Sequence, residues 1–168
     1  LRIGHGEIKD HMFCDGLEDA YSGRLMGSFA QHTADQFMIS REQMDNYAIE
    51  SLTRAQKAIA SGYFDAEIAP VTIKTRKGEL TVSVDEQPGK ANIEKIPKLK
   101  PAFAEDGTVT AANSSSISDG AAALVLMKQS QANARGLKPL ARIVAHASHA
   151  RHPSEFTLAP VGAMDKVL

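Results

Sequence analysis

Residues 119–127 read Asp-Gly-Ala-Ala-Ala-Leu-Val-Leu-Met, and this stretch decides the predicted fold class. Its apolar run, 121–127, suits a buried strand after an Asp-Gly pair, although its alanines also favour a helix. A helix over residues 128–135 follows, with Gly136 as its stop, and then a second apolar, β-branched stretch at 140–147 that suits a buried strand. Strand, helix and strand in that order indicate a layered α/β core.

The first hundred residues do not follow this rhythm. Their clearest element is a helix over residues 41–61, because apolar residues recur there at spacings of three and four. Ser40 is its predicted cap, Gln43 completes a capping box, and Gly62 is a natural stop. A shorter helix is expected at residues 28–37.

Further along, the apolar period changes from helical to two. This change predicts a β-hairpin with strands at residues 71–75 and 80–84 and a turn at 76–79. Residues 85–101 are polar, rich in lysine and without clear periodicity, so we expect a loop there. The turn-rich stretch at residues 113–120 is expected to be irregular as well. The first hundred residues therefore resemble an excursion from the α/β core.

Composition restricts the classes of function. The chain has 168 residues, 43% hydrophobic and 23% charged, which fits about one globular domain. Its net charge of -1 gives no general attraction to nucleic acid or anionic membranes. The longest apolar run, residues 121–127, is far shorter than the roughly 20 residues that cross a bilayer. Without an initiator methionine, and with a helical pattern at the last residues, the chain is expected to be part of a longer polypeptide.

Cysteine and histidine offer little catalytic chemistry. Cys14 is the one cysteine, so neither an intramolecular disulfide nor an all-cysteine metal site can form, which fits the cytoplasm. Its neighbours supply no cation and no helix start, and we expect an inert thiol. Residues three apart on a strand face opposite ways. His146, His149 and His152 are therefore not expected to share a metal ion, and Pro153 argues against placing them on a helix.

A serine run and a lysine run carry more open interpretations. Ser115 lies among several serines before Asp119, but the G-x-S-x-G pattern of a nucleophile elbow is absent. Such hydroxyls more often cap backbone groups or line a binding pocket, and a serine hydrolase using Ser115 is kept as an alternative. The lysines between residues 90 and 100 suit either a solvated face or phosphate binding.

Several segments in order carry a family resemblance. They are residues 26–27 (Met-Gly), 39–43 (Ile-Ser-Arg-Glu-Gln), 67–71 (Glu-Ile-Ala-Pro-Val), 98–103 (Lys-Leu-Lys-Pro-Ala-Phe), 107–113 (Gly-Thr-Val-Thr-Ala-Ala-Asn), 119–123 (Asp-Gly-Ala-Ala-Ala) and 139–144 (Pro-Leu-Ala-Arg-Ile-Val). Together they cover essentially the whole chain. They resemble the thiolase superfamily, most closely the biosynthetic acetoacetyl-CoA thiolases.

The resemblance implies a fold and a domain plan. Thiolases have two similar five-layered α/β/α/β/α halves, with an α+β loop domain inserted into the first. Residues 1–111 would be that loop domain, which covers coenzyme A and helps assemble tetramers. Residues 112–138 would end the N-terminal half, and residues 139–168 would begin the C-terminal half.

The resemblance also implies substrate contacts. Leu17 and Phe103 would touch the pantetheine or adenine end, and Lys90 and Lys95 would approach the charged coenzyme. Ala111 and Ser115 would bind the pantetheine amides, and Met26 and Phe156 would border the acyl pocket. Phe156 replaces a common methionine, and Leu52 stands where some relatives use a tyrosine beside potassium.

The family's catalytic groups are a nucleophilic cysteine, an activating histidine and a second cysteine. The resemblance places the first upstream of this chain and the others downstream, and Cys14 aligns with neither cysteine, so no catalytic residue is assigned here. Coenzyme A thioesters would be substrates, with no cofactor and no metal. We expect a segment of a homotetrameric acetyl-CoA C-acetyltransferase that condenses two acetyl-CoA or runs in reverse. The alternative is a truncated, non-catalytic module for coenzyme A binding or assembly.

Overall fold

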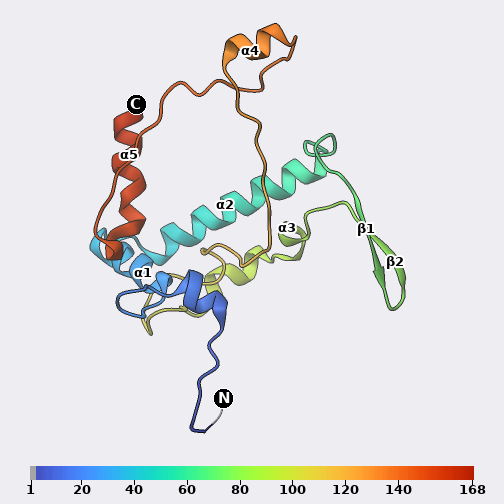
Figure 1. The fold of residues 1–168 in the computed structure, drawn as a ribbon. Helices are drawn as coiled ribbons and strands as arrows, with labels where there is room; N and C mark the ends of the chain where they lie inside the picture. The colour runs from blue at the N-terminus through green and yellow to red at the C-terminus, as the bar shows by residue number, and fades with distance from the viewer. Residues whose placement is uncertain (1–2) are drawn as a thin grey trace. The chain divides into compact units, whose positions relative to one another are not determined.

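The computed structural model describes residues 3–168, which form two compact units (Figure 1). The central unit is Ala30–Ser115. The terminal unit combines the residues up to Phe29 with Ser116–Leu168. No helix among the described residues is long and apolar enough to cross a membrane.

The long helix of the central unit confirms the strongest sequence prediction. Helix α2 runs over Arg41–Ala60, and both halves of the capping box are present. The Gln43 N–H donates to Ser40 Oγ at 3.2 Å, and the Ser40 N–H donates to Gln43 Oε1 at 2.8 Å. Gly62, at φ +69°, takes the left-handed conformation that ends the helix. The shorter helix expected before it is α1, Met26–Gln36.

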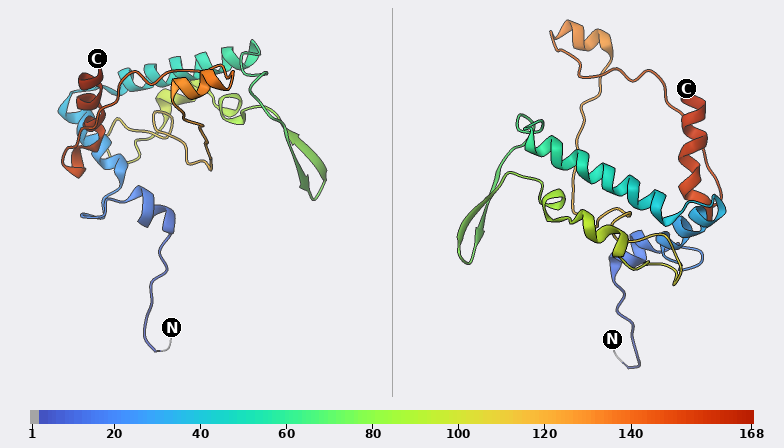
Figure 2. Two further views of the ribbon diagram at one scale, coloured as in Figure 1. Left: turned by 45° about the horizontal axis from the view of Figure 1, so that its top comes forward. Right: turned by 180° about the vertical axis from the view of Figure 1, so that it is seen from behind.

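The predicted hairpin is also present. Strands β1 (Val71–Thr75) and β2 (Gly78–Val82) pair antiparallel, with Ile73 opposite Leu80. The turn is two residues long rather than the four expected, because Gly78 pairs with Thr75 and belongs to the ladder. Figure 2 shows the hairpin extending away from α2, and its strand residues are exposed apart from the half-buried Val82.

The prediction of a loop at residues 85–101 is wrong. This stretch contains helix α3 (Glu86–Lys90), capped by the Asp85 carboxylate, and the 3-10 helix η2 (Ile93–Lys98). Both contact α2. Helix α3 has five residues and η2 has six, and η2 buries a single residue, Ile96, so neither is long enough to generate a helical apolar period.

The layered α/β core is not formed by residues 3–168. Residues 121–127 and 140–147 form neither strand nor helix, and the described residues offer them no pairing strand. Leu124 is 87% exposed and Ile143 is 70% exposed. A buried strand needs neighbouring strands and covering layers, and the described residues supply neither.

The remaining helices lie in the terminal unit. They are the π-helix η1 (Phe13–Leu17), α4 (Gln129–Ala134), the 3-10 helix η3 (Pro153–Leu158) and α5 (Ala159–Val167). Helix α4 confirms the expected element, and Gly136 follows it at φ +63°. Helix α5 confirms the helical pattern seen at the end of the sequence.

The core of the central unit is small and half polar. Its buried apolar residues are Ala34, Ile96 and Val109. Its buried polar residues are Gln31, Asp45 and Thr110. Buried polar groups must be hydrogen-bonded, so hydrogen bonds contribute as directly as apolar packing to the arrangement of this unit.

Candidate functional site

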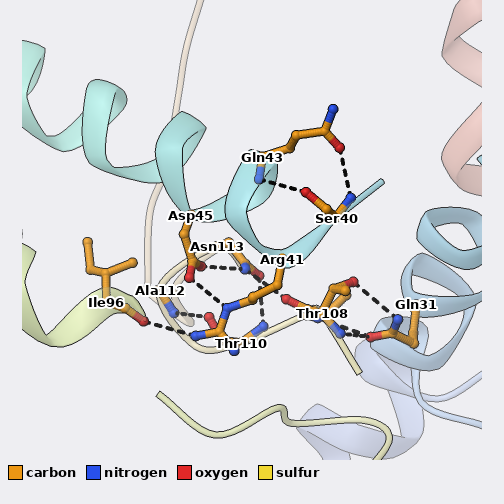
Figure 3. Close-up of polar contacts among 11 residues, drawn as sticks. Gln31, Ser40, Arg41, Gln43, Asp45, Ile96, Thr108, Thr110, Ala112 and Asn113 are labelled. Atoms are coloured by element: carbon orange, nitrogen blue, oxygen red, sulfur yellow. Dashed lines mark hydrogen bonds and ion pairs between the residues drawn. The ribbon is translucent and has the colours of Figure 1, made fainter. Parts of the chain in front are cut away.

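The most organised part of the central unit is the stretch 108–115, which we call the Asn113 turn. Asn113 Oδ1 accepts from the Thr110 N–H at 2.7 Å, and Asn113 Nδ2 donates to the Thr108 carbonyl at 3.0 Å. Thr110 Oγ1 accepts from the Ala112 N–H at 3.3 Å, and the Ser114 hydroxyl donates to the Thr110 carbonyl at 2.7 Å. Figure 3 shows most of this network. The side chains of the Asn113 turn thus fix the backbone of the same turn.

Gln31 on α1 fixes the entry to the turn. Its Oε1 accepts from the Thr108 N–H at 2.8 Å and from the Val109 N–H at 3.0 Å. Its Nε2 donates to Thr108 Oγ1 at 3.2 Å (Figure 3). The same Nε2 donates to Asp35 Oδ1 at 2.8 Å. The side chain uses both its acceptor and its donors, as a buried amide must.

An ion pair on α2 contacts both the Asn113 turn and η2. Arg41 Nε lies 2.7 Å from Asp45 Oδ2, and the Asp45 residue is 3% exposed. Asp45 Oδ1 accepts from Asn113 Nδ2 at 3.2 Å, and Arg41 Nη2 donates to the Ile96 carbonyl at 3.0 Å (Figure 3). The first helical turn of α2 therefore holds two other segments of the central unit.

Five of the residues implied as substrate contacts belong to this unit. Ala111 and Ser115 are exposed on the Asn113 turn, and Phe103 is half-buried before it. Lys90 and Lys95 are exposed on α3 and η2. Four of the five thus lie on segments that contact α2, and the roles assigned to them stay predictions.

The lysines of this region differ in their partners. Lys90 Nζ pairs with the Glu86 carboxylate one turn earlier on α3. That hydrogen bond, with the attraction of the ammonium group, lowers the pKa of Glu86. Lys95 forms no ion pair within residues 3–168. Of the two, Lys95 has the more available charge.

The other three implied contacts lie in the terminal unit. Leu17 ends η1 and Met26 begins α1, and both are half-buried. Phe156 on η3 meets the buried ring of Phe29 edge-on, with ring centroids 6.4 Å apart. The Arg24 guanidinium lies 4.8 Å from the centroid of that same ring.

A cavity of about 500 Å³ has Phe29 in its lining. Its lining residues are Asp19, Tyr21, Ser22, Arg24, Phe29 and residues 152–154. Asp19 at its edge accepts from the Ser22 hydroxyl and the Ser22 N–H at 2.6 and 2.7 Å. These bonds, the hydroxyl's first, lower the pKa of Asp19 because they stabilise its charged form.

The cysteine and histidine candidates have structural surroundings. Cys14 is exposed within η1. His152 caps η3, since its Nδ1 accepts from the Ser154 N–H at 3.3 Å. Within residues 3–168, no three His, Cys, Asp or Glu side chains are grouped so that they could hold a metal ion.

Comparison with known proteins gives a consistent family. The model for the "Thiolase, N-terminal domain" family matches residues 1–130. An acetyl-CoA acetyltransferase of Yarrowia lipolytica is 46% identical over 168 residues, which is 100% of this chain and 42% of that protein. The chain thus spans about two fifths of the length of such relatives.

Solved structures agree. The Bacillus anthracis acetyl-CoA acetyltransferase superposes with a TM-score of 0.89 at 45% identity, covering 99% of this chain and 42% of that one. Human mitochondrial 3-ketoacyl-CoA thiolase gives 0.85 at 35% identity, covering 100% and 44%. The expected thiolase-type fold is thereby confirmed for the part that this chain covers. The chain belongs to the thiolase family, matching its N-terminal domain.

Proposed function

We propose that this chain is the coenzyme A-binding segment of an acetyl-CoA C-acetyltransferase. Such an enzyme condenses two acetyl-CoA to acetoacetyl-CoA, or runs in reverse. The observation that carries the proposal is the identity of about 45% along the whole chain to proteins named for that activity. The nucleophilic cysteine and its acid-base partners would lie in other parts of the full-length protein.

The Asn113 turn supports the proposal chemically. Its backbone is fixed by internal hydrogen bonds, while Ser115 stays exposed and its hydroxyl bonds to none of residues 3–168. A rigid turn with an available hydroxyl suits the amides of a pantetheine arm, because a preorganised partner loses little entropy on binding. Ala111 and Ser115 would hold that arm.

The other contacts divide by chemistry. Lys95 and Lys90 would approach the phosphates, Lys95 with the larger effect because Lys90 already pairs with Glu86. Leu17 and Phe103 would cover apolar parts of the coenzyme. Met26 and Phe156 would border the acyl group. Assembly as a homotetramer in the cytoplasm belongs to the same proposal.

Two measurements on the full-length protein test this proposal. Calorimetry should detect binding of coenzyme A, and thiolysis of acetoacetyl-CoA should proceed. Ser115→Ala should weaken binding several-fold while turnover at saturating substrate persists, because the hydroxyl contributes one hydrogen bond of about 1 kcal/mol. Ser116→Ala is the matched control, since the Ser116 hydroxyl pairs with Ser118 at 3.2 Å.

Each result has a definite meaning. Absence of any affinity for coenzyme A would refute the proposal. Binding without thiolysis would favour the non-catalytic module. Complete loss of turnover in Ser115→Ala, with binding intact, would favour a serine hydrolase.

A further inference from the structure

We infer that the Arg41–Asp45 ion pair is a positioning element that holds the pantetheine-binding and phosphate-binding segments of the site on one turn of α2. The inference rests on the proposed function, and it adds two residues that touch no substrate. Arg41 and Asp45 would fix the positions of the Asn113 turn and η2 relative to α2.

The first step concerns the Asn113 turn. Asn113 Nδ2 donates to Asp45 Oδ1 at 3.2 Å and to the Thr108 carbonyl at 3.0 Å. This fixes the direction of the amide, so that Asn113 Oδ1 meets the Thr110 N–H at 2.7 Å. Asp45 therefore fixes, through Asn113, the backbone that carries Ala111 and Ser115.

The second step concerns η2. Arg41 uses Nε for the Asp45 carboxylate and Nη2 for the Ile96 carbonyl, at 2.7 and 3.0 Å. Ile96 directly follows Lys95 and is itself 5% exposed. A guanidinium can serve two partners in fixed directions, whereas an ammonium group is a single point charge. Arg41 thus fixes the segment that carries Lys95.

The third step separates this pair from an ordinary surface ion pair. Asp45 has a 5% exposed side chain in its pair with Arg41, whereas Glu50 is 59% exposed in its pair with Arg54 on the same helix. Exposed pairs of this spacing contribute little to stability. A buried charge is costly to leave without its partner, so the Arg41–Asp45 geometry is strongly enforced.

The effect on binding follows from populations. A ligand that binds one arrangement of a segment has its dissociation constant multiplied by the inverse of the fraction in that arrangement. If loss of a tether lowers that fraction to about one tenth, affinity falls about tenfold. Each tether should therefore affect the ligand parts that its own segment contacts.

The experiment uses the full-length protein with two probes, coenzyme A and pantetheine, which lacks the nucleotide and its phosphates. Arg41→Lys keeps a cation beside Asp45 but cannot also hold the Ile96 carbonyl. It should weaken coenzyme A about tenfold and leave pantetheine unchanged. Asp45→Asn removes the charge that both tethers share and should weaken both probes about tenfold. Glu50→Gln, which breaks the exposed pair, should change neither.

Titrations are made at a temperature where each variant is fully folded by circular dichroism. Under that condition, a variant that lowers only the overall stability of the protein changes neither dissociation constant. Equal effects of Arg41→Lys on both probes, or wild-type affinities in Arg41→Lys and Asp45→Asn, would overturn the inference. If Asp45→Asn does not fold, Arg41→Lys decides alone, because the ratio of its two effects is the readout. Failure of the wild type to bind coenzyme A would refute the proposed function, and the inference with it.

Discussion

The Asp19 carboxylate shows how one short loop shifts the pKa of a half-buried group. The Ser22 hydroxyl is the main cause of its lowered pKa. We expect Ser22→Ala to raise the pKa of Asp19 toward its ordinary value, because the charged form loses its hydroxyl donor. Carboxyl ¹³C chemical shifts followed through an acid titration would measure the change.

The sign of the pH dependence follows from the direction of this shift. A pKa lower in the folded than in the unfolded state gives stability that is present above the unfolded pKa. That contribution is lost as the pH falls through the folded pKa of Asp19. Ser28→Ala is a suitable control, because the Ser28 hydroxyl donates to the Leu25 carbonyl instead. An unaltered Asp19 titration in Ser22→Ala would contradict the prediction.

At this scale the sequence suggested exposed candidates but did not identify the buried side chains that hold their segments. Ser115 was singled out in a serine run and Ala111 through the family resemblance, and the roles of both stay predictions. Asp45 and Gln31 gave no signal in the sequence. An acid four residues after an arginine, as Asp45 is, usually marks an exposed helix face. Their burial depends on Asn113 and Thr108, which are distant in sequence. No local pattern reports such a contact.

Among the elements, α2 has the most complete local specification. Replacing Ser40 with alanine leaves the Gln43 N–H without its cap, so we expect the free energy of unfolding to fall by about 1 kcal/mol. Urea denaturation of the full-length protein would measure it. Ser51→Ala, at an exposed position inside the same helix, should cost nothing because alanine has the higher helix propensity. Equal losses in both variants would show that the cap has no special role.

The same helix explains which elements were predictable. The capping box and the hairpin depend on residues close in sequence, and both were predicted, although the second strand of the hairpin begins two residues earlier than expected. Helix α3 and η2 were missed because each is short and contacts α2 through tertiary packing. Asp85 was the local signal for α3, because an aspartate directly before a helix can cap it, as Asp85 does here.

At the scale of the whole molecule, the apolar runs at residues 121–127 and 140–147 are the outstanding feature. Their composition predicted buried strands, yet the described chain leaves both exposed. A strand is defined by its partners as well as its own sequence. Composition could therefore identify these runs as core material without supplying what covers them.

This exposure predicts how the 168-residue chain behaves when it is produced alone. Leu124, Val125 and Leu140 are each at least 87% exposed, and many exposed apolar side chains favour association. We expect sedimentation to show self-association and ANS fluorescence to be high. Heating should lack a single cooperative transition, because little apolar surface is buried and cooperativity depends on a shared core.

A variant makes the cause specific. Replacing Leu124 and Leu140 with lysine should reduce self-association and ANS binding, because charged groups within these apolar runs oppose pairing with another chain. Helical content should stay the same, since neither residue lies in a helix. The matched control replaces Ile3 and Ile8, which are equally exposed but lie outside both runs. A wild-type chain that sediments as a monomer and melts cooperatively would show that these runs need no further strands to be covered.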